Sequence, residues 1–268
     1  MIDEILLSDE DFTICLFCIV DDKMCNIPKH SQANLYPSEM VTLALLFALK
    51  GSGNRSFYRW LVKNLRHLFP NLPERTRLFR LFNVHQQWID LFMADPTLIG
   101  VIDGFGIELI HPRREGRSEK QIGKKGLSNK RWIVGGKLCL LLNNIGLVVG
   151  WDVDTANVYE GTAFQHLVDE VAEQMLVFSD TGFAKEGWNP PNLKPCPRGT
   201  WNDRMIIESV LSMLTRVCHF KQVGHRVWSY FKSRVGWTMA LFNILVQWNG
   251  IEPDETGFVH LSIANFSL

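Results

Sequence analysis

Apolar residues in the first third of the chain recur every three or four positions, as they do along amphipathic helices. One such segment begins at Pro37 and ends near Gly51, and two more cover residues 56–69 and 74–94. Proline in a first turn and glycine just beyond a last turn are typical helix boundaries. The pattern therefore predicts a small all-helical N-terminal domain over residues 1–96.

Beyond Asp95 and Pro96 the apolar residues alternate with polar ones or form short runs, which is typical of strands. We expect strands over residues 98–110, 132–142, 147–153 and 175–179. We expect helices over residues 160–174, 202–217 and 227–249, and a proline-rich loop over residues 189–200. This order predicts an α+β fold over residues 97–268, with a mixed sheet flanked by helices.

The composition is that of a globular protein. Of the 268 residues 46% are hydrophobic, which is ample for a core. The first residues, MIDEILLSDEDF, are acidic where a secretory signal would be basic. Apolar runs such as residues 41–49 are too short to span a bilayer. We therefore expect a cytoplasmic protein without a membrane partner.

Six cysteines raise the question of disulfides or a metal site. The chain length and the missing secretory signal favour reduced thiols. Cys15, Cys18, Cys25 and His30 have a spacing that nominally fits zinc. Because Cys15 and Cys18 lie in the apolar run of residues 12–20, we expect buried thiols instead and assign no metal there.

Charge is unevenly distributed although the formal net charge is zero. Acids dominate residues 1–40 and 150–175. Bases dominate residues 53–83, 111–137 and 201–234. Such segregation allows a neutral protein to present a basic face to nucleic acid, although each basic cluster is equally well explained as a solvated surface.

One basic cluster lies on the third predicted helix, which opens with ERTRLFRLF. Arg75, Arg77 and Arg80 are expected to lie mostly opposite its apolar positions. A DNA-contacting helix of the helix-turn-helix type requires such a polar face. An amphipathic helix with a solvated arginine face explains the same pattern.

Three carboxylates, one on each of three predicted elements, are candidates for a metal site. Asp103 lies in the apolar stretch VIDG, where an unpaired charge is costly. Asp180 ends a strand in SDTGF, and Glu208 lies within WNDRMIIESVLSML. Carboxylates that bridge two divalent ions serve in-line phosphodiester chemistry. Each acid alone is more simply a turn or surface carboxylate, so only the set indicates this chemistry.

The segment before Glu208 adds two candidates. Trp201, Arg204 and Glu208 have the spacing i, i+3, i+7, which places them on one stripe of a helix. The functional interpretation has Glu208 on metal and Arg204 on a phosphate. The structural interpretation is a surface Arg–Glu pair worth a few tenths of a kcal/mol.

Together these residues resemble a DDE transposase of the bacterial insertion-sequence type, close to the broad IS4/IS5-like group. Four stretches carry the resemblance: VIDG at 101–104, TANVYEG at 155–161, SDTGF at 179–183 and W-x2-R-x3-E at 201–208. The last is similar to the Tyr-x2-Arg-x3-Glu-x6-Lys signature of the family. Trp201 stands in place of the tyrosine, and Thr215 in place of the lysine, with Arg216 next to it.

The resemblance covers about residues 98–245 and implies a ribonuclease-H-like fold for the catalytic domain. It implies that Asp103, Asp180 and Glu208 bind Mg²⁺ or Mn²⁺ and that Arg204 takes part in catalysis. The expected partners are double-stranded DNA, both the terminal inverted repeats and the target, and a second copy of the chain in a homodimer. A nucleoid-associated bacterial protein is implied. The expected DNA contacts outside the N-terminal helix are Lys120, Lys124, Lys125, Lys130, Arg131, Trp201, Arg204 and Arg216.

Two other functions share most of these features. One is a DNA-binding protein that has lost cleavage, such as a repressor, although three intact acids argue against it. The other is a metal-dependent nuclease that does not transpose. Asp152, Asp154 and Glu160 are rival acids, which we interpret as loop and helix-start carboxylates.

Overall fold

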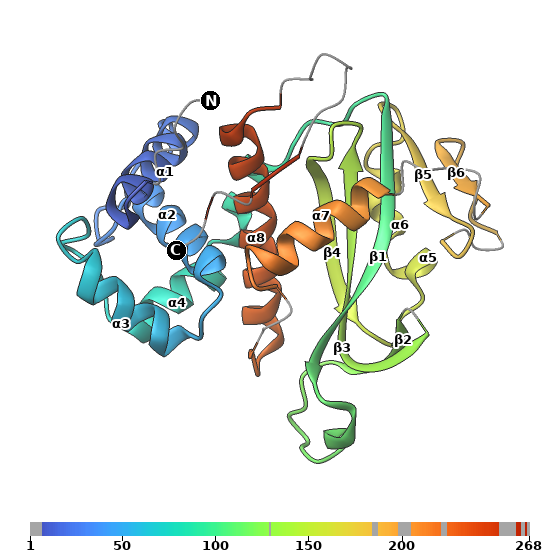
Figure 1. The fold of residues 1–268 in the computed structure, drawn as a ribbon, viewed down its shortest axis with the longest axis horizontal. Helices are drawn as coiled ribbons and strands as arrows, with labels where there is room; N and C mark the ends of the chain where they lie inside the picture. The colour runs from blue at the N-terminus through green and yellow to red at the C-terminus, as the bar shows by residue number, and fades with distance from the viewer. Residues whose placement is uncertain are drawn as a thin grey trace.

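The computed structural model describes residues 7–128, 130–183, 187–197, 205–220, 224–251, 261–263 and 266 (Figure 1). Two of the residues in the predicted stripe, Trp201 and Arg204, lie outside this range. None of the helices in this part of the chain combines the length and the apolar character needed to cross a membrane.

The segment before residue 96 is helical, as the apolar spacing predicts. Its elements are α1 (Asp9–Met24), α2 (Pro37–Lys50), α3 (Asn54–Asn64), α4 (Arg75–Val84) and the 3-10 helix η1 (Gln86–Phe92). The third predicted helix is thus interrupted at His85, whose backbone leaves the helical region and whose ring stacks on Trp88 with centroids 4.5 Å apart. The second ends at Asn64 rather than at residue 69.

The boundaries of α2 follow from local chemistry. Pro37 occupies the first turn, and the Glu39 carboxylate accepts a hydrogen bond of 2.6 Å from the backbone N–H of Tyr36. At the other end Gly51 takes a left-handed conformation, with φ of 64°, which glycine adopts without steric cost. Nearly every side chain between these ends is buried, so α2 forms the centre of the helical part.

The thiols of α1 correct one expectation. Cys15 and Cys18 are exposed, not buried. The buried stripe of α1 includes Phe12, Leu16 and Val20 at a spacing of four residues, which leaves positions 15 and 18 on the solvent side. No group of three or more metal-ligating side chains is found there or elsewhere among the described residues.

Six strands form one mixed sheet. They are β1 (Ile99–Ile110), β2 (Lys124–Ser128), β3 (Arg131–Asn143), β4 (Val148–Thr155), β5 (Leu176–Asp180) and β6 (Leu193–Cys196). Strand β3 pairs antiparallel with β1 along one edge. Strands β4 and β2 also pair antiparallel with β3. The short strands β5 and β6 extend the sheet in parallel beyond β1.

Each of the four predicted strands is confirmed to within two residues at either end. The two additional strands were not expected. Strand β2 carries the charged sequence KKGLS, and β6 lies in the proline-rich stretch predicted to be a loop. Both pair at the periphery of the sheet, where pairing needs little apolar sequence.

Helices cover both faces of the sheet (Figure 1). They are α5 (Glu160–Ala163), α6 (Gln165–Asp169), α7 (Met205–Arg216) and α8 (Trp228–Asn249), with a short 3-10 helix η2 (Pro112–Arg114) after β1. The helix expected over residues 160–174 is replaced by α5, α6 and turns, because the fully buried Phe164 takes a non-helical conformation between them. Predictions for α7 and α8 agree with the structure where it describes them.

Two apolar layers hold the sheet. Ile102, Cys139 and Leu141 face the layer beneath α5 and α6. Their neighbours Val101 and Leu140 face a larger layer that runs without a break through α7 and α8 to α1 and α2. A curled mixed sheet with helices on both faces fits a ribonuclease-H-like fold. The shared core leaves the domain boundary near residue 96 a prediction.

Candidate active site

Asp103 and Asp180 occupy equivalent places on neighbouring strands. The parallel pair β1 and β5 aligns Val101 with Phe178. Two residues further along each strand stand Asp103 and Asp180, and both are partly buried. Since side chains alternate along a strand, both carboxylates lie on the face that carries Val101. The register therefore brings two of the three predicted acids to one place.

Glu208 lies on the helix that covers this same face. The buried residues Ile207, Val210 and Leu214 of α7 belong to the apolar layer that includes Val101. Figure 1 shows α7 lying across the sheet. Glu208 follows Ile207 in the first turn and is exposed. All three acids thus lie on one side of the sheet, although they form no closed three-ligand cluster among the described residues.

The turn after Asp180 is held by the segment TANVYEG. The Tyr159 hydroxyl donates a hydrogen bond of 2.7 Å to the carbonyl oxygen of Gly182. Gly161 lies so close to the carbonyl oxygen of Phe183 that a Cβ at this position would overlap it. Phe183 in turn donates its N–H to the Asp180 carbonyl at 3.2 Å. Two stretches singled out in the sequence therefore contact each other directly.

The same segment reaches the VIDG stretch through Glu160. A Cβ on Gly104 would overlap the Glu160 carboxylate, so the Glu160 side chain would have to shift to accept a larger residue at that position of β1. Lys137 of β3 lies 3.3 Å from Glu160 and donates a hydrogen bond of 3.0 Å to the Val158 carbonyl. Glu160 is thus paired with Lys137, on the opposite face of the sheet from Asp103.

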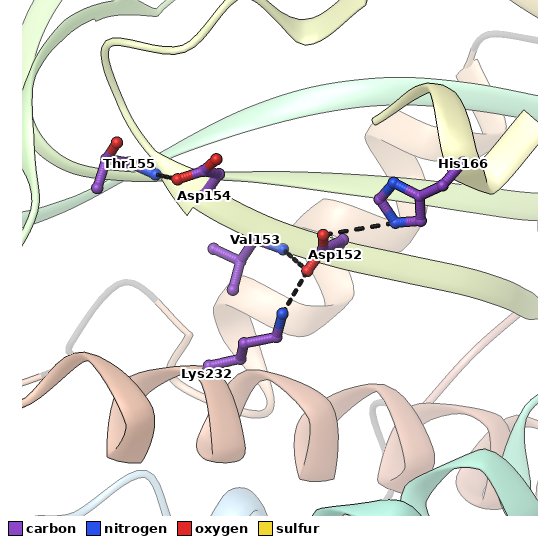
Figure 2. A network of polar contacts seen from close by, with 6 residues as sticks. All are labelled: Asp152, Val153, Asp154, Thr155, His166 and Lys232. Atoms are coloured by element: carbon purple, nitrogen blue, oxygen red, sulfur yellow. Dashed lines mark hydrogen bonds and ion pairs between the residues drawn. The ribbon is translucent and has the colours of Figure 1, made fainter. Parts of the chain in front are cut away.

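Asp152 joins elements on both sides of the edge strand β4 (Figure 2). One of its oxygens accepts a hydrogen bond of 2.7 Å from Lys232 of α8, and the other lies 3.4 Å from the His166 ring of α6. Asp154 accepts a hydrogen bond from the backbone N–H of Thr155. Both acids thus have partners within the protein, and their interpretation as structural stays a prediction.

Cys139 lies among these carboxylates. Complete burial raises the pKa of its thiol well above the ordinary value, and the negative charges of Glu160, Asp103 and Asp152 raise it further. The thiol stays protonated at neutral pH and packs as an apolar side chain. Cys139 is therefore not a nucleophile of this site.

The predicted basic contacts of the sheet lie around β2 and the start of β3. Lys120, Lys124, Lys125, Lys130 and Arg131 are all exposed. Lys125 pairs with Glu115 at 2.9 Å, and Arg131 pairs with Glu108 at 2.6 Å. Figure 1 shows the loop after β1 projecting beyond the sheet in this region. Arg216 is exposed in the last turn of α7.

The three arginines of α4 do not share one surface. Arg75 lines a cavity next to α8, whereas Arg77 lines a different cavity next to residues 28–37. Arg75 and Arg77 are two residues apart, so their side chains point about 200° apart around the helix axis. Arg77 and the exposed Arg80 share a side. Contact between these residues and DNA stays a prediction.

Sequence reasoning did not single out Arg234, which is the most deeply buried cation in the described part of the chain. It lies in α8 within SRVGWTMALF. The sequence could have indicated this residue only as a single charge among apolar positions. Tyr159 and Lys137, which hold the loops around the acids, were also missed. Their roles depend on contacts between segments 21 to 23 residues apart.

Comparison with known families gives one match. Residues 95–191 match the family model described as "Transposase DDE domain". This segment contains VIDG, TANVYEG and SDTGF and ends before α7 and Glu208. No curated protein matches the chain. The match supports a DDE transposase and leaves the narrower insertion-sequence group as a prediction.

Proposed function

We propose that the protein is a transposase that cuts DNA at the ends of an insertion sequence and joins the freed 3′-hydroxyl to target DNA. The observation that carries this proposal is the equivalent placement of Asp103 and Asp180 on adjacent parallel strands, within the segment that matches the transposase model. Glu208 on α7 completes the proposed acid site, defined as Asp103, Asp180 and Glu208.

The donor chemistry of the acid site suits a hard divalent ion. Its three carboxylates supply only oxygen, which Mg²⁺ and Mn²⁺ prefer, and no nitrogen or sulfur. When bound there, such an ion supplies positive charge that activates water and stabilises the developing charge on the phosphate. We propose Asp103, Asp180 and Glu208 as its ligands.

Other residues of the chain would orient the substrate. The contacts of Tyr159 and Gly161 fix the turn that follows Asp180, which keeps that carboxylate in place as DNA binds. Lysines and arginines around β2 would follow the DNA backbone without reading its sequence. Arg204 and Trp201, known here only from the sequence, are proposed to grip a phosphate near the cleaved bond.

Conservative substitutions test the proposal. Asp103→Asn, Asp180→Asn and Glu208→Gln are each expected to lower cleavage of a plasmid carrying the element ends by on the order of 10²-fold or more. Binding of the same DNA should change little because the basic residues remain. Asp169→Asn, an exposed acid on α6, is the matched control. Parental cleavage by Asp180→Asn, or full activity in EDTA, would overturn the acid site.

A strand-transfer assay separates the remaining alternatives. A transposase is expected to give joined products between the element ends and a second plasmid. Cleavage without joined product would instead identify a metal-dependent nuclease. DNA binding with neither product would identify a protein that has lost its chemistry.

A further inference from the structure

A second charged region lies away from the acid site, where the starts of α3, α4 and α8 converge. A cavity of about 530 Å³ opens there, lined by residues from all three helices. We call it the arginine cavity. It is lined by Arg55, Arg75, Arg226 and Arg234, and its described lining contains no acidic side chain. Such a lining creates a strongly positive field.

The helix ends add to this field. None of the residues at the N-caps of α3, α4 and α8, namely Gly53, Glu74 and Val227, caps its helix with a side-chain hydrogen bond. The first backbone N–H groups of a helix have no partner within the helix and carry partial positive charge. Glu74 is exposed and does not line the cavity. Three helix starts therefore face one basic space.

Arg234 is the central observation. Its side chain is only 4% exposed, and its guanidinium lies 4.6 Å from the ring centroid of Phe47. Its terminal nitrogens make long hydrogen bonds, of 3.4 and 3.5 Å, to the carbonyl oxygens of Ser52 and Ala48. Its Nε has no hydrogen-bond partner among the described residues. A buried cation held by neutral carbonyls and an aromatic ring is costly unless an anion joins it.

Two further polar groups at the cavity are buried without a partner in the described structure. They are the Oγ of Ser52 and the Nδ1 of His225. Burial lowers the pKa of His225 to about 4, with the Arg234 charge contributing. Burial also lowers the pKa of Arg234 to about 10, so Arg234 stays charged and His225 neutral at neutral pH. Unsatisfied groups of these kinds suit the oxygens of a tetrahedral anion.

We propose that the arginine cavity binds a phosphate of the DNA backbone, at a site separate from the acid site; the choice of DNA rests on the proposed function. Arg234 forms its floor, and Arg55, Arg75 and Arg226 contact the outer phosphate oxygens. The cavity is larger than a single phosphate requires, which leaves room for the adjoining sugars. A free phosphate ion has the same chemistry, and the experiment separates the two sources.

The test measures binding by the full chain in EDTA, so it does not depend on cleavage or on the acid site. Inorganic phosphate at constant ionic strength is expected to raise the melting temperature of the parent, relative to chloride. A short DNA duplex should bind the parent and should be displaced by phosphate. In Arg55→Gln/Arg226→Gln the phosphate-induced shift should vanish, and duplex affinity should fall on the order of tenfold or more.

A matched control removes the same charge elsewhere. Arg59→Gln/Lys63→Gln changes two exposed cations of α3 that do not line the cavity, and its phosphate-induced shift should equal that of the parent. Arg234→Met, which keeps the apolar volume, should lose the shift if it folds. Equal phosphate shifts in parent and Arg55→Gln/Arg226→Gln would overturn the site. A lost shift with unchanged duplex affinity would overturn the assignment to DNA and identify a site for free phosphate.

Discussion

The acid site and the arginine cavity hold charge in opposite ways. Asp103 and Asp180 lie on adjacent strands, and the turn beyond Asp180 is fixed by the neighbouring segment through Tyr159 and Gly161. Arg234 instead lies on a buried helix, where its hydrogen bonds are long and one nitrogen has no described partner. One region holds its backbone rigidly around the charges, and the other leaves charge unsatisfied. Rigid placement suits chemistry, whereas unsatisfied charge suits binding.

The largest effect on stability at neutral pH is expected from filling the close contact beside Asp180. In Gly161→Ala the added Cβ would overlap the Phe183 carbonyl, so the turn or α5 must shift. We expect a loss of about 1–3 kcal/mol in the free energy of unfolding and a parallel loss of cleavage. Denaturant unfolding and single-turnover cleavage measure the two. Gly224→Ala, which has open space around its Cβ, is the control for the stability measurement.

If Gly161→Ala keeps parental stability and cleavage, the turn after Asp180 tolerates movement, and the contrast with the arginine cavity disappears. If stability falls but cleavage does not, the contact serves folding alone.

The contrast also explains what the sequence could predict. Strands β1, β3, β4 and β5 follow from apolar patterns. The neighbouring placement of Asp103 and Asp180 follows from short motifs on β1 and β5, because register fixes where neighbouring residues of a sheet lie. The arginine cavity joins Ser52, Arg75 and Arg226, which have no common motif. Only tertiary packing brings them together.

Other deviations have the same origin. Strand β6 forms in a proline-rich stretch because β5 offers it a free edge, which local propensity does not register. The helix expected after Glu160 is broken because burial of Phe164 outweighs helix propensity. Cys15 and Cys18 were assigned to the core from a continuous apolar run, although a four-residue spacing decides which side of α1 is buried.

A second effect, confined to acid pH, is expected from the titration of His225. Its pKa is about 4 in the folded chain, below the ordinary value of 6.5. Between these values only the unfolded chain binds the proton, so stability falls as the pH falls from 6.5 to 4. For one group the slope reaches about 1.4 kcal/mol per pH unit. His225→Gln should flatten this part of the stability profile measured in chloride, and His111→Gln, an exposed site, should not.

If the arginine cavity binds phosphate, added phosphate should reduce the loss of stability at acid pH, because a bound anion favours the charged imidazole of His225. An identical profile for parent and His225→Gln in chloride would show that this histidine does not titrate as a buried group.

The smallest effect is expected at Asp152, where a rival acid can be separated from the acid site. Asp152 contacts Lys232 at 2.7 Å, but the two side chains are 23% and 42% exposed, so solvent screens the pair. Asp152→Asn, Lys232→Met and the double variant should give a coupling free energy of about 0.5–1 kcal/mol in a double-mutant cycle. Cleavage by Asp152→Asn should stay near the parental rate, because its partners are His166 and Lys232 rather than a phosphate. A loss of cleavage on the order of 10²-fold, without loss of stability, would instead make Asp152 part of the catalytic machinery and move the acid site toward the edge strand.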